Sequence, residues 1–219
     1  MPPTGREERY EALVRKAVAV LDRGGLVAFP TDTVYGLGAD LFNPAAIERL
    51  FAVKGRSGER AVPVLLADPE DADRVAKEMP LQAKALAREF WPGPLTLVVR
   101  RGPEVPDVAA GGGDTIGIRV PDHGVPRAII RGLGRPITGT SANSSGQPPH
   151  RDAGGVAGDI GARIDLIVPG ECGGHTAPST VVDCTKSPPV VVRVGALSLE
   201  LVRSVCSDAT MHADLSRRG

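Results

Sequence analysis

The sequence contains few cysteines and few aromatic residues, and it lacks the long apolar runs that membrane proteins need. Its 219 residues include three cysteines, Cys172, Cys184 and Cys206, which are odd in number, widely spaced and never in a CxxC pair. The four histidines form no HxxxH or HExxH pair. This pattern argues against a disulfide framework and against a metal site. No segment approaches the roughly 20 apolar residues of a membrane helix, and charges occupy the N-terminus where a signal peptide needs an apolar stretch. We therefore expect a cytoplasmic protein without membrane association.

An excess of charge of one sign is also missing, because 26 Lys and Arg balance 26 Asp and Glu. The aromatic residues are one Trp, two Tyr and four Phe. Proteins that coat nucleic acids usually show a basic excess and aromatic stacking platforms, so general DNA or RNA binding is disfavoured, although a local basic site stays open. The length suits one domain, which we place at residues 1–206, and we expect the polar segment 207–219 to be a disordered tail.

Apolar periodicity and capping residues predict an α/β fold with a mixed sheet. Helix-like spacing begins at residue 6 and ends at Gly24-Gly25, and Asn43-Pro44 provides a cap and a first position for a second helix. The predicted helices cover 6–23, 44–54, 80–90, 124–132, 152–160 and 198–205. The predicted strands are rich in Val and Ile, as strands buried on both faces are, and they cover 26–30, 95–100, 115–120, 136–140, 164–168, 179–184 and 190–194.

Several familiar catalytic motifs are missing as well. The chain has no GxxxxGK[ST] loop, no GxGxxG fingerprint and no GxSxG elbow. No Ser-His-Asp set, Cys-His set or carboxylate pair is evident either. The remaining polar segments combine cationic positions with hydroxyl-rich strand ends. This combination favours binding and orienting polyanions over covalent catalysis by a side chain.

Cationic residues stand at three separate places. Lys54 and Arg56 follow a predicted helix, where a cation is favourable in any case, but the pair could also clamp phosphate or carboxylate. Arg119 and Arg193 each interrupt an apolar strand. A buried Arg needs an anionic partner, and for Arg119 this is either an internal carboxylate such as Asp114 or Asp122, or the carboxylate of a substrate. The residues leave both alternatives open.

Hydroxyl and amide side chains follow or open predicted strands. The segment 30–40 (PTDTVYGLGAD), which carries Thr31, is either a tight turn or a binding loop. In 138–148, Ser141 and Asn143 lie on one side of an extended segment and could bond phosphate or sugar oxygens, or form a plain loop. Ser179 opens another strand.

Taken in order, seven segments resemble the YrdC-like family of threonylcarbamoyl-AMP synthases, in its short single-domain form, over about residues 10–205. They read PTDTVYGLG, KGR, WPGPLT, IRVP, TSANSSG, STVVD and RVG. The resemblance implies a twisted mixed sheet flanked by helices, with a large concave basic cavity. It implies a nucleotidyltransferase that converts L-threonine, bicarbonate and ATP, accompanied by Mg²⁺, into threonylcarbamoyl-AMP and pyrophosphate. The product passes to downstream tRNA threonylcarbamoyl-transfer proteins.

The same resemblance implies roles for individual residues. Lys54 and Arg56 are the implied catalytic pair. ATP contacts are implied for Lys54, Arg56, Thr115, Ser141, Asn143 and Arg193. Threonine contacts are implied for Thr31, Arg119 and Ser179. The nucleophile is the carbamate of threonine itself, so the protein supplies position and charge neutralisation.

The chain departs from the family pattern where Ser57 replaces a Pro after KxR and where the following run lacks a His. Two other functions are weighed against the synthase. One is a non-catalytic module for RNA binding or ribosome maturation, with weak tRNA binding. The other is a carbamoyl-adenylate enzyme with a different acceptor. His175, in a glycine-rich loop, receives no assignment.

Overall fold

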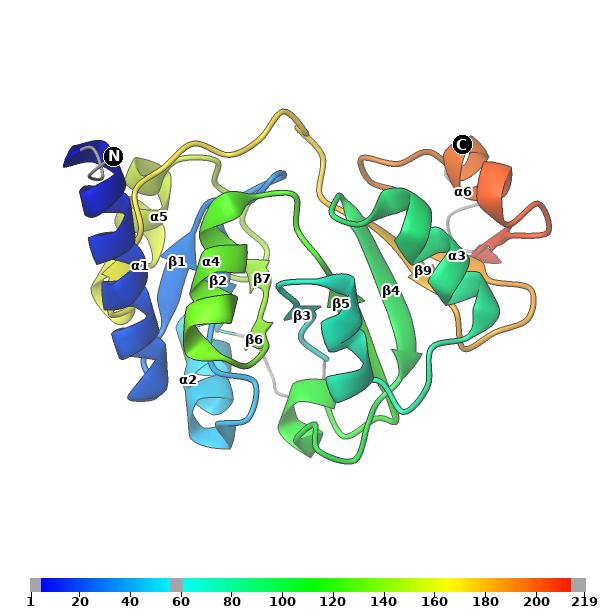
Figure 1. Cartoon of the computed structure of the whole chain (residues 1–219), viewed down its shortest axis with the longest axis horizontal. Coiled ribbons are helices and arrows are strands. Elements are labelled where there is room, and N and C mark those ends of the chain that lie inside the picture. The colour runs from blue at the N-terminus through cyan, green and yellow to red at the C-terminus, as the bar shows by residue number, and fades with distance from the viewer. Residues whose placement is uncertain (1–4, 56–60, 214–219) are drawn as a thin grey trace.

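The computed structural model describes residues 5–55 and 61–213, whose strands form two mixed sheets (Figure 1). The smaller sheet has the order β7 (Thr140–Ser141), β2 (Gly36–Gly38), β1 (Val27–Phe29) and β8 (Leu166–Ile167). The larger sheet has the order β11 (Thr210–Met211), β10 (Val190–Arg193), β9 (Thr180–Asp183), β4 (Leu95–Arg100), β5 (Thr115–Arg119), β3 (Val64–Leu65) and β6 (Ile137–Thr138). In it, β4 pairs with β9 in parallel and with β5 antiparallel. The predicted α/β fold with a mixed sheet is confirmed.

The two sheets meet where the chain passes directly from β6 to β7 through Gly139. A Cβ atom at this position would lie only 2.3 Å from Cγ of Leu65, so glycine lets β3 approach closely. The Gly139 N–H donates to the Pro63 carbonyl at 2.7 Å, and Thr138 N–H donates to the Ala39 carbonyl at 2.8 Å. The 136–140 strand predicted as one piece is therefore two short strands in two different sheets.

Two apolar clusters hold helices against these sheets. Helices α1 (Gly5–Asp22) and α4 (Gly124–Leu133) lie side by side and share one cluster with β1 (Figure 1). The larger cluster joins both sheets to the remaining helices, which are α2 (Pro44–Lys54), α3 (Leu81–Phe90), α5 (Ala153–Asp159) and α6 (Leu199–Val205). Short 3₁₀ helices span Pro69–Arg74, Asp107–Ala110 and Gly161–Arg163.

Local chemistry explains why α2 begins and ends where it does. The Asn43 side chain accepts a hydrogen bond from the Ala46 N–H, and Pro44 occupies the first turn. Gly55 ends the helix in the left-handed conformation, with φ of 61°. This end places Lys54 at a defined point beside the smaller sheet.

The expected tail is partly wrong, because Thr210–Met211 forms β11, which pairs in parallel with β10. Without β11, β10 would be the edge strand of the larger sheet, and the hydrogen bonds that its backbone groups offer outweigh the polar character of this segment. Residues 214–219 lie outside the described chain. Among the described helices, none is both long and apolar enough for a membrane span.

Candidate functional site

A cavity of about 490 Å³ opens between elements of both sheets. Its walls come from the loop after β1, the end of α2, strands β3, β4, β5 and β10, and the 139–149 segment. Three cationic side chains line it, Lys54, Arg119 and Arg193, whereas the described lining residues include no carboxylate. The fold thus brings together cations that are far apart in the sequence, in a cavity suited to an anionic ligand.

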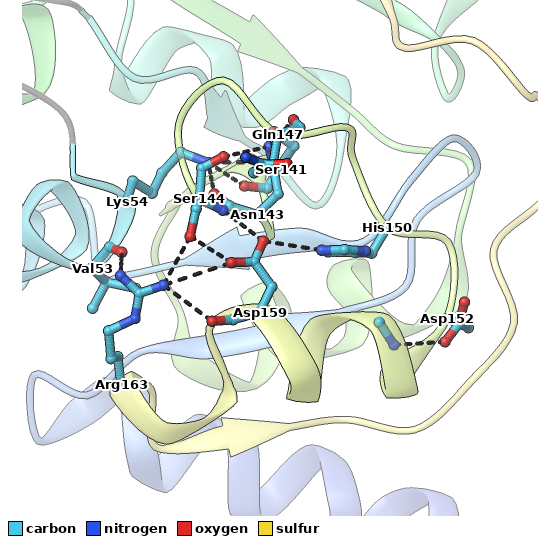
Figure 2. A network of polar contacts seen from close by, with 11 residues as sticks. Val53, Lys54, Ser141, Asn143, Ser144, Gln147, His150, Asp152, Asp159 and Arg163 are labelled. Carbon is cyan, nitrogen blue, oxygen red and sulfur yellow. Dashed lines mark hydrogen bonds and ion pairs between the residues drawn. The ribbon is translucent and has the colours of Figure 1, made fainter.

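Lys54 is buried and fixed against the end of β7 and the loop that follows it (Figure 2). Its Nζ donates to the carbonyl oxygens of Ser141 at 2.5 Å and Asn143 at 2.8 Å. The Asn143 side-chain amide donates to the carbonyls of Ser144 at 2.9 Å and Gln147 at 2.6 Å, so it shapes this loop. Ser141 and Asn143 both line the cavity beside Lys54.

A second layer of polar contacts supports this loop from α5 (Figure 2). The Asp159 carboxylate accepts hydrogen bonds from the Ser144 hydroxyl and, at 2.8 Å, from the Ser144 N–H, and it lies 3.0 Å from Nε2 of His150. Together these hydrogen bonds lower the pKa of Asp159 to about 2, and the two from Ser144 make the largest contribution. Arg163 joins the network to α2 by donating to the Val53 carbonyl at 2.5 Å and to the Ser144 hydroxyl at 2.8 Å.

Arg119 is buried and forms an ion pair with Asp32, whose Oδ1 lies 2.6 Å from its Nη2. Its Nε donates to the Gly93 carbonyl at 2.9 Å, and its Nη1 lies 3.3 Å from the Thr33 hydroxyl. Burial lowers the pKa of Arg119, and the Asp32 carboxylate opposes this shift. The second carboxylate oxygen of Asp32, Oδ2, is buried and has no hydrogen-bond partner among the described residues.

The internal carboxylate beside Arg119 is therefore neither of the two that the sequence suggested. Asp114 pairs with Arg100 at the far end of β4 and β5. Asp32 lies 87 residues before Arg119 in the chain, so local sequence carries no signal for this pair. Among the described residues, protein groups accept from three of the five N–H groups of the Arg119 guanidinium, which itself lines the cavity.

Ser179 and Arg193 meet on the other wall of the cavity. The Ser179 hydroxyl lies 2.8 Å from that of Thr96, while Arg193 donates to the Ser179 carbonyl from Nη2 at 2.8 Å and from Nε at 3.1 Å. No carboxylate of the described chain pairs with Arg193. Desolvation and the charge of nearby Arg119 lower the pKa of Arg193, so an anion bound between them would be stabilised.

Two predicted site residues, Thr31 and Thr115, are not among the described lining residues of the cavity. Thr31 is buried, and its hydroxyl donates to the Val34 carbonyl at 2.7 Å, whereas Thr33 lines the cavity instead. Thr115 opens β5, four residues or about 13 Å along the strand from Arg119. Arg56 lies outside the described residues. The cavity also contains Thr96, which sequence reasoning missed, although a polar residue in the apolar run LTLVVR was an available signal.

Known proteins share the sequence pattern and the fold of this chain. The family model named Sua5/YciO/YrdC, with the description "Telomere recombination", matches residues 19–195. The chain belongs to the Sua5/YciO/YrdC family. This confirms the resemblance based on the seven motifs.

A curated relative, threonylcarbamoyl-AMP synthase of Pyrococcus abyssi, is 41% identical over 207 residues, which is 94% of this chain and 61% of the relative. The enzyme of the same name from Bacillus subtilis is 38% identical over 205 residues, 93% of this chain and 59% of the relative.

A solved structure shows the same fold within the family. The crystal structure of P. abyssi Sua5 complexed with L-threonine superimposes with a TM-score of 0.88 at 41% identity, covering 91% of this chain and 58% of that chain. The present chain therefore spans about three fifths of the length of these relatives. Both curated relatives carry the name of an enzyme, and the solved relative holds an amino acid.

Proposed function

We propose that this chain is an L-threonylcarbamoyladenylate synthase, a nucleotidyltransferase that acts on L-threonine, bicarbonate and ATP. The observation that carries the proposal is the shared cavity, which places Lys54, Arg119 and Arg193 around one space together with hydroxyl groups from both sheets. A triphosphate and an amino-acid carboxylate are both anions and would both be stabilised there. The relatives named threonylcarbamoyl-AMP synthase, and the relative that holds L-threonine, support the choice of substrates.

The proposed reaction needs no nucleophile from the protein. The threonine amine first combines with bicarbonate to give the carbamate and water. A carbamate oxygen then attacks the α-phosphorus of ATP, the bond between the α-phosphorus and the bridging oxygen breaks, and pyrophosphate leaves. Fixed positive groups stabilise the charge that develops on the phosphoryl oxygens, and binding both substrates in one cavity supplies their alignment.

We assign the ATP phosphates to the wall formed by Lys54, Ser141 and Asn143, with Arg56 and Arg193 as further contacts. Thr115 would contact ATP outside the described lining of the cavity. Lys54 is already held at the cavity wall by two carbonyl groups, so its ammonium needs little reordering when a phosphate binds. The magnesium ion would arrive on the phosphates of ATP, which are oxygen ligands of the kind it prefers.

We assign the threonine carboxylate to Arg119, because a guanidinium can bind a carboxylate through two hydrogen bonds and two of its N–H groups have no acceptor among the described residues. Ser179 would bind the carbamate or the amino acid beside it. Thr31 would act through Thr33, since their hydroxyl oxygens lie 3.1 Å apart and Thr33 faces the cavity. The product would pass to downstream tRNA threonylcarbamoyl-transfer proteins.

The test is pyrophosphate release from ATP and magnesium, with threonine and bicarbonate each present or omitted. We expect release only when both are present. Release without threonine would point to a different acceptor. No release, together with tRNA binding that falls steeply as salt rises, would replace the synthase by the RNA-binding alternative.

A further inference from the structure

The segment 169–178, here called the strap, joins β8 of the smaller sheet to β9 of the larger one. Figure 1 shows it as the gold trace that passes above both sheets. Side chains from distant segments hold its carbonyl groups. The Tyr35 hydroxyl donates to the Gly170 carbonyl at 2.9 Å, and Nε2 of His123 lies 3.0 Å from the Glu171 carbonyl. The strap is thus positioned by hydrogen bonds and carries no regular secondary structure of its own.

Arg151 provides the largest share of these contacts. Its Nη2 donates to the Gly173 carbonyl at 2.7 Å, and its Nη1 donates to the carbonyls of His175 and, at 2.5 Å, of Thr33. One guanidinium therefore connects the strap to the loop after β1. Since Thr33 lines the cavity, the connection ends at the wall of the candidate site.

The strap lies directly on Asp32. A Cβ atom at Gly173 would lie 2.8 Å from Cα of Asp32, so only glycine permits this approach. His175 N–H also donates to the Asp32 carbonyl at 3.3 Å. Beneath the strap Asp32 is only 3% exposed while it pairs with Arg119. The strap therefore packs on the backbone of Asp32 and fixes the position from which the Asp32 side chain pairs with Arg119.

The unpartnered Oδ2 of Asp32 works against this closed arrangement. A buried carboxylate oxygen without a hydrogen bond costs free energy, so a backbone shift at Asp32 that let water reach this oxygen would be favourable. Other groups must therefore hold the strap in its position on Asp32. Arg151, with charge-assisted hydrogen bonds to three carbonyl groups on both sides of the contact, is suited to that task.

We propose that Arg151 is a positioning residue, which holds the strap on Asp32 and thereby orients Arg119 toward a ligand carboxylate. That this ligand is threonine rests on the proposed function. Arg151 itself is not among the lining residues of the cavity, so it would act through Asp32 and Arg119.

The first measurement is hydrogen exchange of the strap, which requires no activity. In Arg151→Ala, the amides of Gly173 and His175 should exchange at least about tenfold faster than in the wild type. Arg203→Ala is the matched control, because Arg203 also donates to a backbone carbonyl, but to that of Ala209, which lies outside the strap. Unchanged exchange of the strap in folded Arg151→Ala overturns the proposal, as does equal acceleration in the control.

The second measurement separates a positioning role from a general loss of structure. Arg151→Ala should raise KM for threonine about tenfold and change KM for ATP less than twofold, since misplacing a binding group weakens only its own ligand. Arg151→Lys should fall between the wild type and Ala, because one ammonium cannot reach all three carbonyls. Equal effects on both KM values overturn the proposal.

Gly173→Ala gives a second route if Arg151→Ala does not fold. The added methyl group pushes the strap from Asp32 while Arg151 is unchanged, and we expect the same two signatures. Should the wild type release no threonine-dependent pyrophosphate, the proposed function fails, and hydrogen exchange alone then decides whether Arg151 holds the strap.

Discussion

Removing Arg119 should strongly destabilise the fold, because it breaks a buried ion pair. In Arg119→Met, the Asp32 carboxylate keeps its burial but loses the partner of Oδ1, and Oδ2 has none already. Breaking a buried pair in this way costs about 3–5 kcal/mol. For a chain of this size, that corresponds to a fall in Tm of about 6–20 °C.

The double variant Asp32→Asn/Arg119→Met shows whether the pair is the cause. Without the carboxylate there is no uncompensated buried charge, so the double variant should recover at least about 1.5 kcal/mol relative to Arg119→Met alone. The assay is urea unfolding followed by circular dichroism, with the slope m compared between variants. Additive effects of the two substitutions would refute the coupling that the 2.6 Å distance implies.

A stability change of this size leaves the protein folded at low temperature, where ligand binding can be measured. There, Arg119→Met should bind threonine weakly and the ATP–magnesium complex nearly as well as the wild type. If Arg119→Met loses less than about 1 kcal/mol of stability, Arg119 is not paired as described, and its conformation in solution differs from the one that supports our assignment of the carboxylate site.

Three further outcomes follow from the geometry. Lys54→Ala should reduce pyrophosphate release about 100-fold or more because a fixed charge at the phosphates is lost, and it should also lower the unfolding midpoint because the carbonyls of Ser141 and Asn143 lose their donor; near-normal rates contradict the assignment. Because the pKa of Asp159 is lowered to about 2, its contribution to stability is present above pH 4 and is lost as the pH falls toward 2. Urea midpoints should therefore fall over this range more steeply in the wild type than in Asp159→Asn. Gly139→Ala should lower the free energy of unfolding by about 1–3 kcal/mol, since its Cβ would overlap the Leu65 side chain; a neutral effect would show that β3 can shift.

Most helices and long strands were predictable from sequence because their signals are local. Asn43 and Pro44 define the start of α2, and the run LTLVVR defines β4 within its own six residues. The strands that were missed lack such signals. Gly36–Gly38 reads as a turn, yet its glycines pair with β1 beneath Phe29, and Thr210–Met211 is a strand only because the edge of β10 lies beside it.

In the candidate site, too, the residues that could be predicted from sequence are those with local signals. Lys54, Ser141 and Asn143 stand in motifs with strong local patterns, and the structure places all three in one cavity. Asp32 was not identified as the partner of Arg119, because the pair depends on how two distant loops pack. Likewise, periodicity cannot distinguish Thr31 from Thr33 in a loop, where the side-chain directions follow from turns and not from a regular repeat.

The pairing of Arg119 with Asp32 divides the cavity into two electrostatic regions. Taken together, Arg119 and Asp32 carry no net charge, so they exert little attraction on a distant carboxylate. A carboxylate binds there through hydrogen bonds to correctly oriented N–H groups of Arg119. Arg193, without a carboxylate partner in the described chain, retains its full charge toward the ligand space. Ionic strength screens net charges over about 10 Å at 0.1 M salt but hardly affects short directional bonds in a buried site. Added salt should accordingly weaken the capture of a polyphosphate well before it weakens that of an amino acid.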